Sequence, residues 1–303
     1  MTAPRYPVSL GPDPNTRAPN WVLPKGACDT HAHVFGPPDL FPYADKRRYT
    51  PPAAPIEHYM NMQAITGLSR AVFVTPTAHG HDNRVILNAI EKMEGRARGI
   101  ANINESFDDA ALDELHEGGI RGARFHLMDD RPGSVDFLLA HLPHLTRRNW
   151  VLDLHVDPKD LIEHASFIRT LPGPIIIDHM ARVRARDGLD QPAFKILLDL
   201  LKDDRFWVKL CSFDKISAIP KAHVEGSLPF MDMVPFAQAV IDAAPDRVLW
   251  GTDWPHANTF VPGRTPNEGD LLSLLAVIAP DSATRTKILV DNPARMFGFR
   301  KED

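Results

Sequence analysis

The 303-residue sequence is poor in cysteine and contains no long apolar run. Two cysteines, Cys28 and Cys211, are too few for a disulfide framework, so we expect a cytoplasmic location. No stretch reaches the ~18 apolar residues of a membrane-spanning helix. Residues 1–24 are polar and proline-rich, and they lack the apolar core of a signal peptide. These features predict a protein without a membrane partner.

Positive charge is also scarce, because 34 Lys and Arg residues stand against 39 Asp and Glu residues, a formal net charge of −5. Proteins that bind nucleic acids usually concentrate basic residues on one face, so we expect no nucleic-acid partner. The sequence lacks the G-x-S-x-G motif of serine hydrolases. It also lacks the Gly-rich turn of open nucleotide-binding sheets. Proline and histidine are abundant instead, with 28 and 14 residues.

Apolar segments bounded by turn residues alternate along the chain with amphipathic segments. Eight segments are predicted to be strands: 27–35, 70–76, 97–103, 120–127, 150–156, 174–180, 206–212 and 247–255. Clear helix predictions lie between them: 83–95, 109–118, 134–148, 160–170, 191–203, 235–244 and 270–279. Such alternation predicts a parallel sheet with right-handed crossovers. We therefore predict an α/β protein, a single-domain (β/α)8 TIM barrel over residues 27–303 that follows an N-terminal arm of residues 1–26.

Polar residues interrupt four predicted strands near their carboxyl ends, where barrel active sites are built. The first strand contains His31 and His33, which face the same side because they are two residues apart. The fifth, sixth and eighth strands contain His155, His179 and Asp253. Singly, such residues are often hydrogen-bonded core histidines or turn caps. Burying all of them without partners would cost several kcal/mol, so we expect one joint site, with ligands that suit zinc and similar ions.

The remaining histidines and both cysteines have simpler interpretations. A second His-x-His pair, His79 and His81, lies in a predicted loop, and we assign it no metal role. Neither Cys28 nor Cys211 has the basic neighbours of an activated thiol, so both are expected to serve packing.

Four motifs resemble the amidohydrolase superfamily: CDTHAHVFGP from residue 28, DHMAR from 178, WGTDWPH from 250 and DNPARMFGF from 291. The resemblance extends from Lys25 to about Phe299 and is strongest to the lactonase branch that contains 2-pyrone-4,6-dicarboxylate lactonase. It implies a (β/α)8 barrel. It also implies a hydrolase that opens the ring of a small carboxylated or sulfonated lactone in aromatic-compound catabolism. Examples are 2-pyrone-4,6-dicarboxylate and a muconolactone.

The motif positions of these lactonases also imply a set of substrate-binding residues. They correspond here to Tyr49, Thr77, Arg124, Arg182 and Lys215, to which we add Arg131, His256 and Asn258 from neighbouring loops. Forked arginine donors suit an anionic substrate, although an ion pair between strands is an equally good interpretation of Arg124. Lys215 stands where the pyrone-dicarboxylate lactonases have arginine.

His155 is the more important departure from that branch. The pyrone-dicarboxylate lactonases have tyrosine there and work without a metal, whereas histidine restores the ligand set of metal-dependent relatives. We predict one divalent ion, zinc by preference, held by His31, His33, His155 and Asp253. Asp253 would take a proton from the attacking water, and His179 would orient that water or polarise the carbonyl. Without a metal, the histidines would polarise the carbonyl and Asp253 would remain the base.

Other functions use a similar set of residues. A decarboxylase or a lactone isomerase of the same superfamily is one alternative, and a sugar-acid lactonase is another. A non-catalytic protein that binds a metal or an organic acid is a third. The expected partner is a small anionic lactone, and the chain could be a monomer or a small homo-oligomer.

Overall fold

The computed structural model describes residues 6–127, 134–223 and 226–300, and its centre is a ring of parallel strands. The strands are β1 (Cys28–Ala32), β2 (Arg70–Val74), β3 (Ala97–Ala101), β4 (Ile120–His126), β5 (Val151–His155), β6 (Ile175–Ile177), β7 (Phe206–Leu210) and β8 (Val248–Trp250). Each strand pairs with the next one along the chain. A parallel bridge between Ala32 and Trp254 joins the two ends of the sheet. The predicted (β/α)8 barrel is confirmed.

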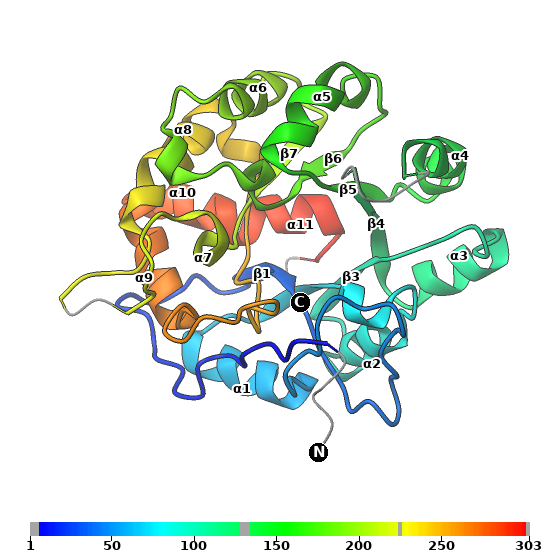
Figure 1. The fold of residues 1–303 in the computed structure, drawn as a ribbon, viewed down its shortest axis with the longest axis horizontal. Coiled ribbons are helices and arrows are strands. Elements are labelled where there is room, and N and C mark those ends of the chain that lie inside the picture. Colours follow the sequence, from blue (N-terminus) through cyan, green and yellow to red (C-terminus); the bar gives the residue numbers. More distant parts are fainter. Residues whose placement is uncertain (1–5, 128–133, 224–225, 301–303) are drawn as a thin grey trace.

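Helices surround the strands on the outside of the ring (Figure 1). They are α1 (Ile56–Thr66), α2 (Arg84–Lys92), α3 (Asp109–Glu117), α4 (Ser134–Arg147), α5 (Pro158–Ile168), α6 (Pro192–Leu200), α7 (Phe213–Ile216), α8 (Val234–Ala243), α9 (Glu268–Ile278), α10 (Ser282–Thr286) and α11 (Asn292–Phe297). All seven predicted helices are present, with bounds that differ by a few residues. In the described part of the chain, none of the helices has the length and apolarity needed to cross a membrane.

Local sequence explains where these helices start and what they bury. The side chain of Asp108 accepts a hydrogen bond from the backbone N–H of Ala111 at 2.9 Å, so it caps the start of α3. Pro192 is the first residue of α6, where its missing N–H costs nothing. Helices α1 to α9 contribute buried apolar side chains to one continuous cluster that also contains residues of the strands.

A smaller apolar cluster fills the amino-terminal end of the barrel interior. Inward-facing residues of the strands, including Val72, Val74 and Ile176, pack there against Phe297 and Phe299. The last two belong to α11 and the residues after it, so the C-terminal segment closes this end of the barrel. Polar residues therefore remain for the opposite end, at the carboxyl ends of the strands.

The first, sixth and eighth strands are shorter than predicted. His33, His179 and Asp253 lie just beyond the ends of β1, β6 and β8. After β6 the chain makes a left-handed turn, with φ angles of 51° at His179 and 53° at Arg182. Asp253 also has a positive φ, 63°. Such angles are incompatible with strand pairing and cost non-glycine residues energy, which is often seen at functional sites.

Asp29 connects β1 to the segment after β8. Its Oδ1 accepts hydrogen bonds from the backbone N–H groups of His31 and Thr252, both at 3.0 Å. Its Oδ2 accepts from the hydroxyl groups of Thr252 at 2.6 Å and Tyr59 at 3.1 Å. Burial raises the pKa of Asp29 to about 6. One fully buried carboxylate thus holds together the two segments that carry three of the four expected ligands.

Asp29→Ala is predicted to lower the free energy of unfolding by at least about 3 kcal/mol, because several buried donors lose their acceptor. Urea denaturation at neutral pH measures this loss. Asp39→Ala removes an exposed carboxylate from the loop after β1 and is expected to cost less than about 0.5 kcal/mol. Equal losses in the two variants would contradict a structural role for Asp29.

Candidate active site

His31, His33 and Asp253 meet where β8 returns to β1. The backbone N–H of His33 donates to the carbonyl of Trp254 at 2.7 Å, and that of Asp253 donates to the carbonyl of His31 at 2.8 Å. Nε2 of His31 and Nε2 of His33 lie 3.6 and 3.5 Å from Oδ1 of Asp253. The three ligand atoms are all within 4.8 Å of one another. Two imidazoles and a carboxylate therefore converge on one point.

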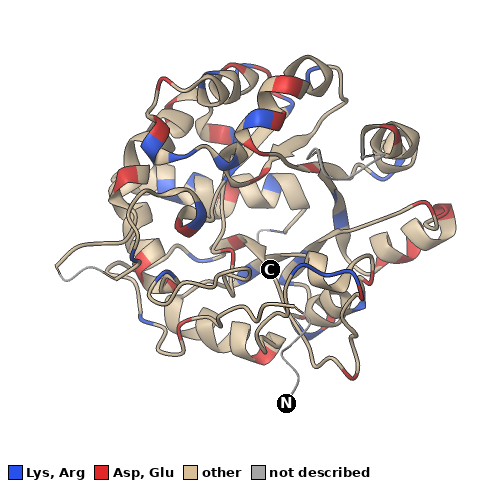
Figure 2. Ribbon diagram, viewed as in Figure 1, with Lys and Arg blue, Asp and Glu red and all other residues tan. Residues whose placement is uncertain are grey.

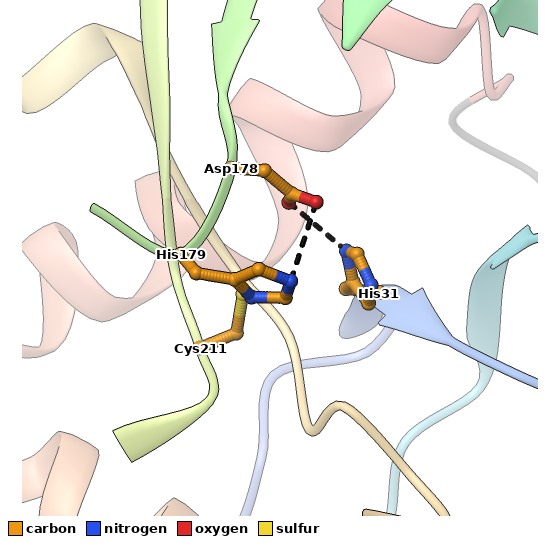
Figure 3. Close-up of side chains that lie close together, drawn as sticks. All are labelled: His31, Asp178, His179 and Cys211. Carbon is orange, nitrogen blue, oxygen red and sulfur yellow. Dashed lines mark hydrogen bonds and ion pairs between the residues drawn. The ribbon is translucent and has the colours of Figure 1, made fainter. Parts of the chain in front are cut away.

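The surrounding protein orients both imidazoles. Nδ1 of His33 lies 2.7 Å from the carbonyl oxygen of Val74, which can only accept, so this nitrogen carries a proton and Nε2 is directed towards Asp253. Nδ1 of His31 lies 3.1 Å from Oδ1 of Asp178 (Figure 3). Nε2 of His31 is buried and has no hydrogen-bond partner among the described residues. Orientation by carbonyl and carboxylate oxygens is typical of histidines that bind metal ions.

Asp253 is held so that one oxygen faces these histidines. Its Oδ2 accepts a hydrogen bond from the hydroxyl of Ser212. Burial alone would raise the pKa of Asp253, but the imidazoles of His33, His179 and His31 lower it well below the usual value. The ionised Oδ1 therefore faces Nε2 of both His31 and His33. A carboxylate and two imidazoles that converge in this way form a donor set that fits a divalent metal ion.

A second group of side chains lies beside His31 and comprises Asp178, His179 and Cys211 (Figure 3). Nδ1 of His179 lies 2.8 Å from Sγ of Cys211, and Nε2 lies 3.3 Å from Oδ2 of Asp178. Burial lowers the pKa of His179 to about 4, so this imidazole is neutral at pH 7. Burial also raises the pKa of the Cys211 thiol well above its usual value, which makes it a poor metal ligand.

A layer of buried charged side chains lies beneath both groups, on the side away from the cavity, and contacts them. Nζ of Lys209 lies 2.6 Å from Asp153, 3.4 Å from Asp178 and 3.2 Å from Nδ1 of His31. Arg124 donates to Oδ2 of Asp178, and its guanidinium also lies 3.1 Å from Nε2 of His179. Each of these charges has an opposite charge as a partner, as buried charges require.

Asp153, Asp178 and Lys209 were not among the predicted site residues. A signal was present, because Asp153 and Lys209 are charged residues in the middle of the otherwise apolar strands VLDLH and FWVKL. Their position two residues before His155 and Cys211 places them on the inward face, one layer deeper.

A cavity of about 150 Å³ opens above these layers at the carboxyl ends of the strands. Ten of the predicted site residues line it: His33, Tyr49, Thr77, Arg124, His155, His179, Arg182, Lys215, Asp253 and Asn258. Arg48 and His126, which were not predicted, line it as well. His31 is fully buried in the protein beneath. The cavity therefore combines a potential metal site with several cationic side chains.

Two predicted residues, His155 and His256, lie apart from the expected groups, and a third is not described. His155 lines the cavity beside His126, with ring centroids 4.9 Å apart, but it does not belong to the group formed by His31, His33 and Asp253. His256 does not line the cavity, because its fully buried ring points to Glu268, with Nε2 3.2 Å from Oε1. Arg131 lies outside the described residues.

Comparisons with known proteins show the family to which the chain belongs. The family profile described as amidohydrolase matches residues 28–299. The chain is 43% identical to a 4-sulfomuconolactone hydrolase from Rhizobium radiobacter, over 96% of each protein. It is 37% identical to a 2-pyrone-4,6-dicarboxylate hydrolase from Comamonas testosteroni, over 93% of each. An apo crystal structure from Agrobacterium tumefaciens matches with a TM-score of 0.79 and 25% identity, over 93% of this chain and 99% of that one. The chain belongs to the amidohydrolase family, as predicted.

Lys209→Met is predicted to lower the free energy of unfolding by about 3 to 5 kcal/mol, because it leaves the buried carboxylate of Asp153 without its cation. The double variant Asp153→Leu/Lys209→Met removes both charges and should recover roughly half of that loss. Urea denaturation of the two variants and the native protein measures both values. A double variant no more stable than Lys209→Met would show that the pairing of these charges is not what matters.

Proposed function

We propose that this protein hydrolyses small anionic lactones, either carboxylated or sulfonated, in the breakdown of aromatic compounds. The observation that carries the proposal is the convergence of His31, His33 and Asp253 on the floor of a cavity whose walls carry Arg124, Arg182 and Lys215. Relatives that match nearly the whole chain are named as hydrolases of a sulfomuconolactone and of a pyrone dicarboxylate, which supports the predicted enzyme class.

Asp253 is the base of the proposed reaction. The residue lines the cavity, and its pKa is held well below the usual value, so its carboxylate is ionised at neutral pH. The water oxygen attacks the lactone carbonyl carbon as Asp253 takes the proton. Asp253 then returns its proton to the ring oxygen as the ring C–O bond breaks, and the new carboxylic acid loses its proton to solvent to give a carboxylate. Proton transfer of this kind contributes about 10²- to 10⁴-fold to the rate.

The cationic side chains bind the substrate and stabilise developing charge. The Arg124 guanidinium touches His179 and faces the cavity, where it can stabilise an oxyanion. Arg182 and Lys215 lie on the outer wall and would hold a carboxylate or sulfonate. Burial raises the pKa of Tyr49, whose hydroxyl bonds with Thr77, so this phenol remains a neutral donor. Asn258 offers a further amide contact.

His31, His33 and Asp253 would hold one divalent ion, for which we propose zinc. We propose His155 as a further ligand, because it lines the cavity and neither ring nitrogen has a hydrogen-bond partner among the described residues. A bound ion of this kind polarises a carbonyl and lowers the pKa of water to about 7. The protein's own contribution is to fix both imidazole tautomers through Val74 and Asp178.

The remaining expectations are also part of this proposal. The compartment is the cytoplasm, which is consistent with two cysteines that are both free and buried. The enzyme acts as a monomer or a small homo-oligomer, and its partner is the anionic lactone.

Metal analysis of the purified protein is predicted to find roughly one divalent ion per chain. His33→Ala should abolish most of this binding, because it removes one of three converging ligands. His81→Ala is the matched control, since it removes a histidine from the other His-x-His pair, whose members belong to no potential ligand group among the described residues. Equal loss of metal in the two variants, or retention in both, would refute the assigned site.

Asp253→Asn is predicted to lower kcat for an anionic lactone by about 10³-fold, because the amide cannot take the proton from water. Circular dichroism and the Tm should remain close to those of the native protein. Asp246→Asn, an exposed carboxylate beside Lys287, is the control for loss of one negative charge. Turnover by Asp253→Asn within a few-fold of the native value would exclude the proposed base.

A further inference from the structure

A second cavity, of about 370 Å³, adjoins the catalytic cavity. Arg182 and Lys215 line both cavities and form the boundary between them. Beyond this boundary the wall consists of Arg184 and Arg186 from the loop after β6, and of residues 216–218 at the end of α7 and just after it. The two cavities are therefore neighbours that share two cationic side chains.

Cationic side chains without partners distinguish this second cavity. Among the described residues, no carboxylate lies within ion-pair distance of Arg182 or Arg184, whereas Arg169 on the outside of the barrel lies 2.5 Å from Asp199. Arg186 lies 3.7 Å from Asp187. Acidic and basic residues are otherwise interspersed over the outer helices (Figure 2). In a chain with a net charge of −5, this local excess of positive charge indicates a site for an anion.

One acidic side chain does contribute to the wall. Asp157, at the start of α5, lines the second cavity together with the four cations. The carboxylate of Asp214 lies 3.0 Å from Nζ of Lys215 and offsets part of its charge. The positive charge of the cavity therefore rests mainly on Arg182 and Arg184.

The loops that carry these residues are held in place. The amide of the buried Gln191 donates to the carbonyls of Arg184 at 2.9 Å and Gly188 at 2.7 Å. On the opposite wall, Arg264 donates to the carbonyls of Asp214 at 2.6 Å and Ser217 at 2.9 Å. Fixed loops reduce the entropy cost of binding, because the backbone that carries the unpaired guanidinium groups is already in place.

We propose that the second cavity is an anion-binding site, which receives the carboxylate or sulfonate of the substrate at the mouth of the catalytic cavity. Arg184 and Arg186 attract the anion, and Arg182 and Lys215 then hold it as the lactone ring reaches Asp253. The identity of the ligand as a substrate rests on the proposed function. The anion site itself does not, because small polycarboxylates carry the same group without being lactones.

Titration calorimetry with citrate tests the site without any need for activity. The double variant Arg184→Gln/Arg186→Gln is predicted to bind citrate about tenfold more weakly than the native protein. The control Arg147→Gln/Arg169→Gln removes the same charge from the C-terminal ends of α4 and α5, and it should bind citrate like the native protein. Equal affinity of the two double variants would overturn the proposal.

Steady-state kinetics with an anionic lactone then tests whether the site serves the substrate. In Arg184→Gln/Arg186→Gln, kcat/KM should fall about tenfold through a rise in KM, and its decrease with added NaCl should become shallower. A fall in kcat as large as that in kcat/KM would overturn a role in substrate capture. If the native enzyme opens no lactone, the proposed function fails, and the citrate titration still decides whether the anion site exists.

Discussion

The site depends on the junction at which the eighth strand returns to the first and closes the barrel. Asp29 accepts hydrogen bonds from both sides of this junction, and backbone hydrogen bonds join His31 and His33 to the residues after β8. Nε2 of His31 and Oδ1 of Asp253, which are far apart in the sequence, thereby lie 3.6 Å from each other. Any change that opens the junction separates the imidazoles from Asp253, so the fold and the chemistry share one set of contacts.

Inside the barrel, polarity increases in layers from the closed end to the cavity. On β5, Val151 belongs to the smaller apolar cluster at the amino-terminal end, Asp153 to the buried charges and His155 to the cavity wall. On β7, Trp207 and Lys209 follow the same order, and Cys211, just after the strand, lies against His179. The charged layer is costly to bury, and its oppositely charged pairs offset that cost while they orient His31 and His179. The cationic side chains at the cavity form the outermost layer, nearest to solvent. Their charge matches an anionic substrate.

The fold and the residues of the inner site could be predicted because they leave local signals. Histidines two apart in an apolar strand, such as His31 and His33, reveal a polar inward face. Asp178 and Lys209 were missed because their role depends on partners from distant strands. Asp253 and His256 illustrate another limit, since both have positive φ angles, of 63° and 60°, which a pattern of residue types does not reveal. These turns direct Asp253 into the cavity and His256 towards Glu268.

Anomalous diffraction from crystals of the metal-loaded enzyme tests the central claim most directly, because it locates the ion independently of activity. The account predicts one anomalous peak about 2.0 to 2.2 Å from Nε2 of His31, Nε2 of His33 and a carboxylate oxygen of Asp253. A peak between His79 and His81, or one ligated by Asp178 and Cys211 with His33 and Asp253 uninvolved, would contradict it.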